Sequence, residues 1–247
     1  MLLVMLKRTF DIFFSSIGLI FLSPIFLIFI LMIFLQDFSN PFYRAPRVGK
    51  NGKIFTMVKL RSMIINADKN KVDSTASDDM RITRVGMMIR AYKLDELTQL
   101  INVLKGDMSL VGPRPNVQRD VDLYSETEKR LLSVKPGITD FSSIIFSDEG
   151  DILSGLDDPD IAYNQLIRPW KSRLGILYIE NQSLLLDMYL IFMTVVAIIN
   201  KSSALNYISK KVESVSDNLE LIEVCKREKD LVPSIPPGHD AIVTSRE

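Results

Sequence analysis

The sequence has 247 residues, 47% of them hydrophobic, and its 30 Lys and Arg residues balance its 30 Asp and Glu residues. The only histidine, His239, lies in a proline-rich stretch near the C-terminus, and the only cysteine is Cys225. These counts argue against Ser-His-Asp, Cys-His and histidine-rich zinc chemistry and exclude an intramolecular disulfide, which leaves carboxylates, hydroxyls, Arg, Lys and a hard metal ion for catalysis.

The balanced total hides an uneven distribution of charge. Residues 41–93 contain twelve Lys and Arg against four Asp, a net charge of +8, whereas residues 140–160 contain seven acidic residues and no Lys or Arg. The basic stretch either faces phosphates or anionic lipid headgroups or forms an ordinary solvated surface. The length predicts one domain or two small ones, enough to bury a core.

Residues 12–35 carry no charged side chain and predict a membrane-embedded helix. As a helix, these 24 residues would be about 36 Å long, against about 30 Å for the hydrocarbon core of a bilayer. A core helix of a soluble protein does not fit this run. A cleaved signal peptide does not fit either, because the run is too long and no small-residue cleavage site follows it.

Ser23 and Pro24 lie near the middle of this run. Proline removes one helical hydrogen bond and clashes with the preceding turn, so we expect a kink or a break, with the Ser23 hydroxyl able to bond a released carbonyl. Basic residues flank the run on both sides: Lys7, Arg8, Arg44, Arg47, Lys50 and Lys53. Positive charge favours the cytoplasmic side, so both ends point there. From the residues alone, two interpretations stay open: a re-entrant helix within one leaflet, and a single kinked span.

The segment after the apolar run predicts short strands and helices. Alternating hydrophobic residues indicate strands, whereas leucines at helical spacing indicate a helix. In chain order, we expect a turn at residues 49–52, a strand at 53–63, a mobile polar loop at 64–80, a helix at 87–104 ended by Gly106, a buried strand at 108–111 and a stiff turn at 112–115.

The rest of the chain predicts mainly helices. We expect them at residues 119–132, 161–180, 184–199 and 211–230, followed by a disordered-type tail from Val232. The helix at 184–199 is almost wholly apolar but carries Asp187, so it lies either at the membrane interface or in the core.

Two adjacent acids, Asp95 and Glu96, are the main candidates for chemistry. On a helix their directions differ by about 100°, so they cannot mirror each other, but both can border one site. Alone, they could be ordinary acids near a helix N-terminus. Their neighbours in the sequence favour a site: Arg90 precedes them, Asp107 follows, and Arg114 stands between two prolines, which pre-orders its guanidinium to bind a diphosphate.

Several motifs in about the first 200 residues resemble one family. They are Lys7-Arg8-x-Phe10-Asp11, Ser23-Pro24, Lys59-Leu60-Arg61-Ser62-Met63, Lys93-Leu94-Asp95-Glu96-Leu97-x-Gln99-Leu100, the run Asn102-Val103-Leu104-Lys105-Gly106-Asp107-Met108-Ser109-Leu110-Val111-Gly112-Pro113-Arg114-Pro115, and Lys135-Pro136-Gly137-Ile138-Thr139. In this order they resemble the bacterial sugar transferases, the small monotopic phosphoglycosyl transferases. The block from Leu94 to Pro115 is long and specific.

The resemblance implies a membrane-bound enzyme that moves a sugar 1-phosphate from a UDP-sugar to a polyprenyl phosphate, usually undecaprenyl phosphate, and releases UMP. It also implies the bacterial inner membrane, with the active site on the cytoplasmic face. Such a reaction is the first membrane step in making capsule, O-antigen, exopolysaccharide or protein glycans. Expected partners are the two substrates, the membrane, other glycan-assembly enzymes and a second copy of the chain, but no nucleic acid.

The resemblance also assigns roles to individual residues. It makes Asp95 the nucleophile that forms a covalent phosphosugar intermediate, with Mg²⁺ held at or near Asp95 and Glu96 assisting. Phosphate and nucleotide-sugar binding falls to Arg90, Arg114, Lys59 and Arg61. The break at Ser23 and Pro24 matches the family's re-entrant anchor, which favours that interpretation.

Three features depart from the family pattern. Thr98 stands where the family usually has proline, a change that we expect at a helix surface with no effect on the chemistry. Residues 140–145, Asp-Phe-Ser-Ser-Ile-Ile, replace the commoner Gly-Trp-Ala-Gln-Val-Asn, so the identity of the sugar stays open. Residues 201–247 exceed the family core and receive no role.

The predicted fold class is mixed α/β and mainly helical, with a re-entrant N-terminal membrane helix and interfacial helices. Its expected parts are a membrane anchor at residues 1–40, a transferase domain at 41–200 and a partly disordered extension at 201–247. Two other interpretations compete with the enzyme: an inactive membrane-anchored scaffold or regulator of glycan assembly, and an accessory subunit of a transporter. The intact Asp95, Glu96, Arg90 and Arg114 argue against the scaffold.

Overall fold

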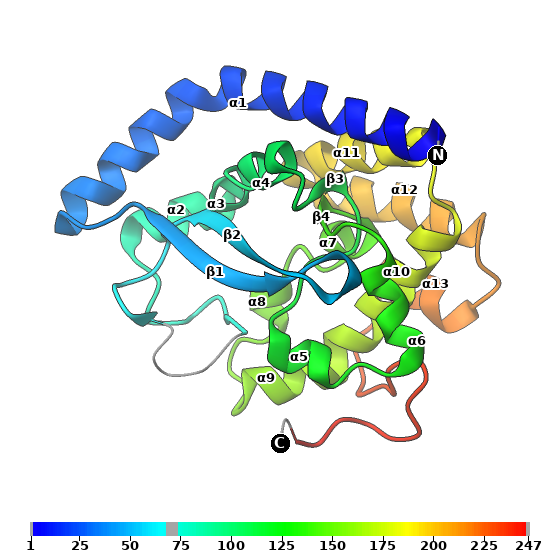
Figure 1. Cartoon of the computed structure of the whole chain (residues 1–247). Helices are drawn as coiled ribbons and strands as arrows, with labels where there is room; N and C mark the ends of the chain where they lie inside the picture. Colours follow the sequence, from blue (N-terminus) through cyan, green and yellow to red (C-terminus); the bar gives the residue numbers. More distant parts are fainter. Residues whose placement is uncertain (1, 68–73, 246–247) are drawn as a thin grey trace.

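The computed structural model describes residues 2–67 and 74–245 of the chain. Within them the fold is mixed α/β and mainly helical, with two small two-stranded sheets, which confirms the coarse fold class. Figure 1 shows the long N-terminal helix α1 (Leu2–Asp37) across one side of the molecule and the C-terminal segment on the opposite side.

Helix α1 is long and apolar enough to cross a membrane, judged by its length and composition. It runs through Pro24 as one helix and bends in its central part (Figure 1). The Ser23 hydroxyl donates a 2.7 Å hydrogen bond to the carbonyl of Ile20, which Pro24 leaves without its helical donor. The expected bend and hydroxyl contact are present, whereas a break into two helices is not.

Polar side chains fasten the first half of α1 to the globular part. Arg8 donates hydrogen bonds of 2.5 and 2.7 Å to two carbonyls at the end of α4 (Leu100–Lys105), a position that favours positive charge. The buried carboxylate of Asp11 accepts two hydrogen bonds of 3.1 Å from the start of β3 (Ser109–Val111). The Lys-Arg-x-Phe-Asp motif is therefore a docking motif as well as a charged membrane flank.

The larger sheet follows α1 directly. Strands β1 (Phe42–Val48) and β2 (Ile54–Leu60) pair antiparallel across a turn, η1 (Lys50–Gly52). The predicted turn and second strand are confirmed. The first strand was not predicted, because Pro46 and the neighbouring arginines obscure its alternation.

The smaller sheet brings two family motifs together. Strand β3 confirms the buried strand predicted at 108–111. It pairs in parallel with β4 (Gly137–Thr139), a strand that was not predicted. The two backbones approach so closely that a Cβ atom on Gly137 would lie 2.1 Å from the amide nitrogen of Gly112. Glycine is required here because any side chain would force the strands apart.

The single helix predicted at residues 87–104 is wrong. The structure has α2 (Arg84–Ala91), a one-turn helix α3 (Leu94–Leu97) and α4, with Lys93 in the left-handed conformation at φ 56°. The cause lies in polar side chains that bind the backbone of β2: the Thr98 hydroxyl donates to one carbonyl, and the Asn102 amide bonds both a carbonyl and an N–H. These contacts outweigh the helical periodicity.

Several later helices are also more broken than predicted. The helix expected at residues 119–132 is α5 (Gln118–Asp122), α6 (Glu126–Lys129) and the 3₁₀ turn η3 (Arg130–Ser133). The stretch expected at 161–180 comprises the end of α9 (Pro159–Ala162), a π-helical turn η4 (Tyr163–Ile167) and α10 (Arg168–Glu180). The helix at 184–199 is confirmed as α11 (Leu184–Ile199), but 211–230 is covered by the end of α12 (Lys201–Glu213) and by α13 (Leu219–Lys226).

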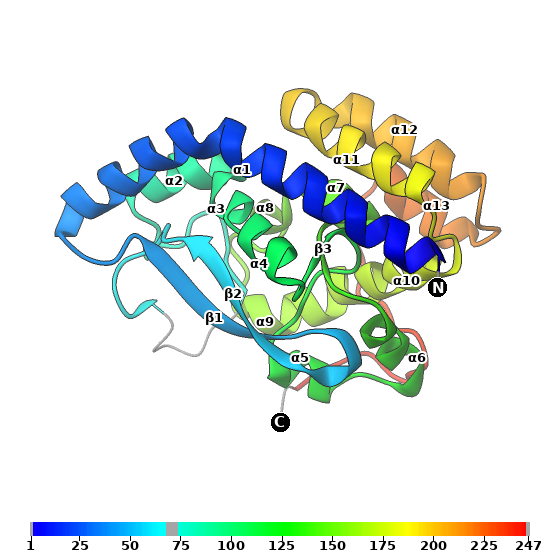
Figure 2. The ribbon, with the colours of Figure 1, turned by 45° about the horizontal axis from the view of Figure 1, so that its top comes forward.

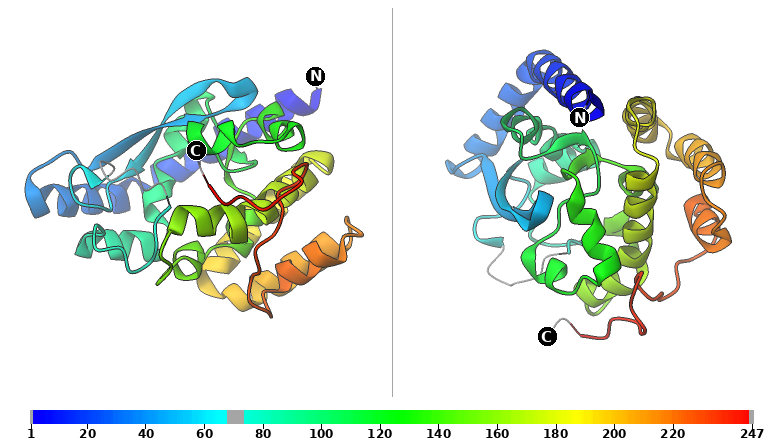
Figure 3. Two further views of the ribbon diagram at one scale, coloured as in Figure 1. Left: turned by 90° about the horizontal axis from the view of Figure 1, so that it is seen from below. Right: turned by 45° about the vertical axis from the view of Figure 1, so that its right-hand side comes forward.

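The main hydrophobic core surrounds α7 (Phe141–Ile145), which is followed by α8 (Glu149–Ile152). Helices α10, α11 and α12 all pack against α7. Figures 2 and 3 show α11, α12 and α13 side by side on one flank of the molecule, away from the β1–β2 sheet.

The polar loop expected at residues 64–80 is tied at both ends, since Ile64 and Arg81 share a backbone hydrogen bond. Its predicted mobility concerns in part residues 68–73, which lie outside the described residues.

The proline-rich C-terminal segment is not a free tail. The hydroxyl of Ser125 donates to the carbonyl of Pro237 at 2.6 Å, and His239 Nε2 lies 3.1 Å from the buried carboxylate of Glu128. Gln165 also donates to the carbonyl of Val243 at 2.8 Å. Two backbone carbonyls and His239 of this segment thus have partners at the start of α6, on α6 and on η4, and the disorder expected from Val232 stays a prediction.

Candidate active site

Asp95 and Glu96 form the first turn of α3, against the end of β2. Lys93 reverses the chain just before them, so α3 leaves α2 at an angle that a continuous helix could not provide. The Thr98 hydroxyl lies within hydrogen-bonding distance of two carbonyl oxygens, those of Asp95 and of Val58 in β2, both at 3.1 Å. Thr98 is buried, so its expected place on a helix surface is wrong.

Two cations converge on Glu96. Arg114 Nη2 lies 2.5 Å and Lys59 Nζ 2.9 Å from the same oxygen, Glu96 Oε1. Arg114 also donates 2.6 Å to the carbonyl of Ile138 in β4, so its guanidinium is fixed between the two family motifs. Lys59 Nζ lies 4.0 Å from the carboxylate of Asp95. The structure thus gathers four of the predicted site residues, Asp95, Glu96, Lys59 and Arg114, into one cluster.

The two acids differ in their electrostatic environment. Burial works against the ionised form of Glu96, but Arg114 and Lys59 outweigh it and hold the pKa of this carboxyl well below its usual value. At Asp95, burial raises the pKa; Lys59 opposes this rise, and the nearby Glu96 charge adds to it. The two cations therefore favour the ionised form of Glu96, whereas the buried Asp95 has, among the described residues, only the longer ion pair of 4.0 Å with Lys59.

The remaining predicted phosphate binders lie differently. The guanidinium of Arg90, in the last turn of α2, has no hydrogen bond or ion pair with the described residues, and its charge works against the burial that raises the pKa of Asp95. Arg61 binds residues outside the cluster: it donates two hydrogen bonds of 2.5 and 2.6 Å to Asp37 at the end of α1 and a third of 2.9 Å to the carbonyl of Asn40. Arg61 thus fastens α1 to β2.

A magnesium ion would find a limited set of ligands in this cluster. Across residues 2–67 and 74–245, no three His, Cys, Asp or Glu side chains gather as a metal cage. Asp95 and Glu96 supply adjacent carboxylate oxygens, and Mg²⁺ commonly takes one or two carboxylates together with water and substrate phosphate oxygens. These two residues therefore fit a magnesium ion that is bound jointly with a diphosphate.

A second polar cluster was missed in the sequence. Lys93 Nζ donates a 3.0 Å hydrogen bond to the carbonyl of Ser147, two residues before the start of α8. Glu149 of α8 pairs with Lys171, whose ammonium lies 5.2 Å above the ring of Tyr163. The charge of Glu149 also acts on Arg114, where it favours the protonated guanidinium. The acid-rich stretch at 140–160 was visible in the sequence, but its nearness to Asp95 required the fold.

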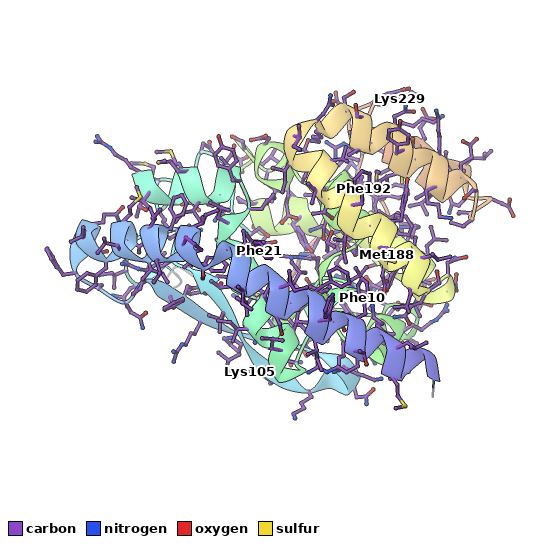
Figure 4. The ribbon with its side chains drawn as sticks, turned by 90° about the horizontal axis from the view of Figure 1, so that it is seen from above. Phe10, Phe21, Lys105, Met188, Phe192 and Lys229 are labelled. Atoms are coloured by element: carbon purple, nitrogen blue, oxygen red, sulfur yellow. The ribbon has the colours of Figure 1, made fainter. Side chains whose placement is uncertain are left out.

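One side of the molecule is unusually apolar. Side chains of α1 and α11 are exposed together there, as Figure 4 shows for Phe21, Met188 and Phe192. The opposite face of α11 is buried, and Asp187 on that face forms a 2.5 Å ion pair with Lys7 of α1. One face of α11 thus belongs to the core, as one interpretation expected. The other face is an exposed apolar surface. The position of that surface at a membrane interface stays a prediction.

Comparisons with known proteins agree on one group. A family model described as "Bacterial sugar transferase" matches residues 2–201. An "Undecaprenyl-phosphate galactose phosphotransferase" of Salmonella typhimurium is 36% identical over 81% of this chain. A "UDP-N-acetylgalactosamine-undecaprenyl-phosphate N-acetylgalactosaminephosphotransferase" of Aeromonas hydrophila is 34% identical over 77% of it.

Coverage of these relatives differs. The chain spans 41% of the Salmonella protein and 43% of the Aeromonas protein. An "Exopolysaccharide production protein ExoY" of Sinorhizobium fredii is 32% identical over 78% of this chain and is itself 84% covered. The name of the Salmonella relative specifies galactose, whereas that of the Aeromonas relative specifies N-acetylgalactosamine.

Proposed function

Since the chain belongs to the bacterial sugar transferase family, we propose that it transfers a sugar 1-phosphate from a UDP-sugar to undecaprenyl phosphate and releases UMP. The names of the Salmonella and Aeromonas relatives support the lipid acceptor, and the Aeromonas name supports a UDP-sugar donor. The sugar itself stays open because those two names differ in it.

The proposed reaction has two displacement steps at one phosphorus atom. A carboxylate oxygen of Asp95 bonds to the β-phosphorus of the donor while the bond from that phosphorus to the bridging oxygen breaks, and UMP leaves with the electron pair. An oxygen of undecaprenyl phosphate then attacks the same phosphorus, the bond from that phosphorus to Asp95 breaks, and the free Asp95 carboxylate is regenerated. Splitting one transfer into two steps is the general use of a covalent nucleophile.

The single observation that carries the proposal is the asymmetry of the acid pair. Glu96 is occupied by Arg114 and Lys59, whereas buried Asp95 has Lys59 no nearer than 4.0 Å. A nucleophile must be free to bond, and the cations around it must remain charged to bind phosphate. Both conditions are met if Glu96 holds the cations and Asp95 reacts.

The other charged residues serve the phosphates. Arg114, Lys59 and Arg90 would bind the donor diphosphate, and Arg90 is available because it lacks a partner in the described part of the chain. Asp95 and Glu96 would hold a Mg²⁺ ion, which when bound neutralises diphosphate charge.

The apolar side of the molecule would place this site at the cytoplasmic face of the inner membrane. The exposed side chains of α1 and α11 would enter one leaflet, and the bend of α1 near Pro24 supports a re-entrant course. The phosphate of the lipid acceptor lies at headgroup level, so an interfacial active site can reach it without extracting the lipid.

The test uses membranes that contain the full chain. We expect UMP release from at least one member of a UDP-sugar panel when undecaprenyl phosphate and Mg²⁺ are supplied, and none from Asp95→Asn. Donor labelled in the sugar should leave label on the wild-type protein when the lipid is omitted. Asp217→Asn is the matched control, because Asp217 is exposed between α12 and α13. Undiminished turnover by the Asp95 variant, or no UMP release from any donor, would contradict the proposal, the latter favouring a scaffold.

A further inference from the structure

The C-terminal extension and the atypical segment at residues 140–145 meet in the structure. The family match ends at residue 201, where α12 begins. Helix α12 packs directly on α7, which is formed by residues 141–145 of the segment that departs from the family pattern. Ala204, Ile208 and Val212 of α12 are wholly buried. Residues that depart from the family therefore contact residues that extend beyond it.

A charged contact fixes the segment just after α7. Lys201 Nζ and Arg227 Nη2, one from each end of the α12–α13 pair, lie 2.5 and 3.2 Å from Asp148 Oδ2. The guanidinium of Arg227 also lies 5.5 Å from the centre of the Phe146 ring. All three charged side chains are partly buried, with 14 to 35% of each exposed. Such a contact is less screened by water than a surface ion pair.

Both chain neighbours of Asp148 interact with residues in or next to the active-site cluster. The carbonyl of Ser147 accepts the hydrogen bond from Lys93, which reverses the chain two residues before Asp95. Glu149 pairs with Lys171, and its charge acts on Arg114. Asp148 thus lies between the extension on one side and the contacts that border Asp95 and Arg114 on the other.

From this connection we propose that the ion-pair clamp of Lys201 and Arg227 on Asp148 positions residues 146–149 as a wall of the donor site, and so sets the affinity and selectivity for the nucleotide sugar. The inference rests on the proposed function. Asp148, Lys201 and Arg227 are positioning residues, since they act through Ser147 and Glu149. The clamp does not touch the reacting carboxylate of Asp95.

The proposal predicts a specific kinetic signature. Replacing Arg227 by Met keeps much of the side-chain packing but removes the charge, so residues 146–149 lose one anchor. We expect the KM for the preferred UDP-sugar to rise about tenfold, and kcat at saturating lipid acceptor to stay within about twofold, as befits lost binding rather than lost chemistry. The ratio of kcat/KM between preferred and poor donors should fall.

Matched variants separate positioning from general stability. Arg227→Lys keeps the charge and should restore most of the KM. Lys229→Met is the control, because Lys229 forms an exposed ion pair with Glu223 in the same extension and should leave KM unchanged. Lys201→Met, at the first position of α12, is the milder test if the Arg227 variant does not fold.

The outcomes distinguish the two proposals. If Arg227→Met and Lys201→Met lower the melting temperature while leaving the donor KM and donor ratios unchanged, the clamp is only structural and the inference is wrong. If Asp95→Asn is inactive in the same preparation, that result leaves the proposed function standing. If Asp95→Asn turns over normally, the proposed function itself fails. An equal loss of kcat for every donor would also overturn the inference, because a wall of the donor site should act on binding.

Discussion

The substitution Glu96→Gln tests whether Glu96 holds the cations so that Asp95 can react. Gln keeps the size and one hydrogen-bonding oxygen but removes the charge that Arg114 and Lys59 share. Breaking a fully buried pair costs about 3–5 kcal/mol and an exposed pair at most about 1 kcal/mol. Because both Glu96 and Arg114 are 20% exposed, we expect about 2 kcal/mol of lost stability, or a fall in melting temperature of about 4–8 °C.

The same substitution should change the chemistry more than the stability. Without the Glu96 charge, Lys59 and Arg114 are free to pair with Asp95, which would occupy the nucleophile, and the pKa of Asp95 should fall because a neighbouring anion that raises it is gone. An active Asp95 must be ionised, so activity is lost as the pH falls through its pKa. We expect kcat to drop by about 10²–10³ and the acid limb of the pH–rate profile to move to lower pH.

The assay is UMP release as a function of pH, with thermal unfolding of the same detergent-solubilised protein. Glu180→Gln is the matched control: Glu180 pairs with Arg130 at a distance of 2.7 Å, but both side chains are about half exposed. That variant should change neither rate nor melting temperature measurably. If Glu96→Gln keeps wild-type kcat, or if its acid limb moves to higher pH, the assignment of Glu96 as the residue that holds the cations is wrong.

Two further predictions concern Asp95 and Arg61. Burial raises the pKa of Asp95, so ionising this carboxyl in the folded state costs stability, and that stability is regained as the pH falls through the pKa. The Asp95→Asn variant should therefore have a higher melting temperature than the wild type in alkaline buffer. In acid buffer the two melting temperatures should be the same. A melting difference that grows toward acid pH would contradict this sign. Arg61→Met should lower the melting temperature, because it breaks the contacts to Asp37 and Asn40, but should leave the KM for the donor within about twofold. A large rise in that KM would instead support the predicted role of Arg61 in binding the phosphates of the donor.

The sequence predicted which residues gather at the candidate site better than the local structure around them. Asp95, Glu96 and Arg114 stand in a contiguous, specific block, and local chemistry such as the two prolines around Arg114 already favours phosphate binding. Periodicity failed here, because the residues from Leu94 to Leu104 keep helical spacing although Lys93 is left-handed, and Thr98 and Asn102 bind β2. Long-range contacts of this kind leave no local signal.

The role of Arg61 shows the same limit. Its motif suggested phosphate binding, but only the fold shows that Asp37 lies within 2.6 Å of its guanidinium. The C-terminal segment is a second case in which the composition did not predict the contacts. Its proline-rich composition is typical of disorder, yet Ser125, Arg173 and Gln165 donate hydrogen bonds to three of its backbone carbonyls.

The position of Asp95 follows from how the membrane helix is attached. Helix α1 is fastened near its start by Arg8 and Lys7 and at its end by the Asp37–Arg61 pair, so both of its halves are attached to the domain. Between these points α1 packs on α2 and α4, the helices on either side of α3. The depth of α1 in a leaflet would therefore set the height of Asp95 relative to the headgroups. Straightening the bend, for example by Pro24→Ala, should change how far Asp95 lies from the lipid phosphate, and so lower transfer to the lipid acceptor while leaving the first, UMP-releasing step at its wild-type rate in single-turnover measurements.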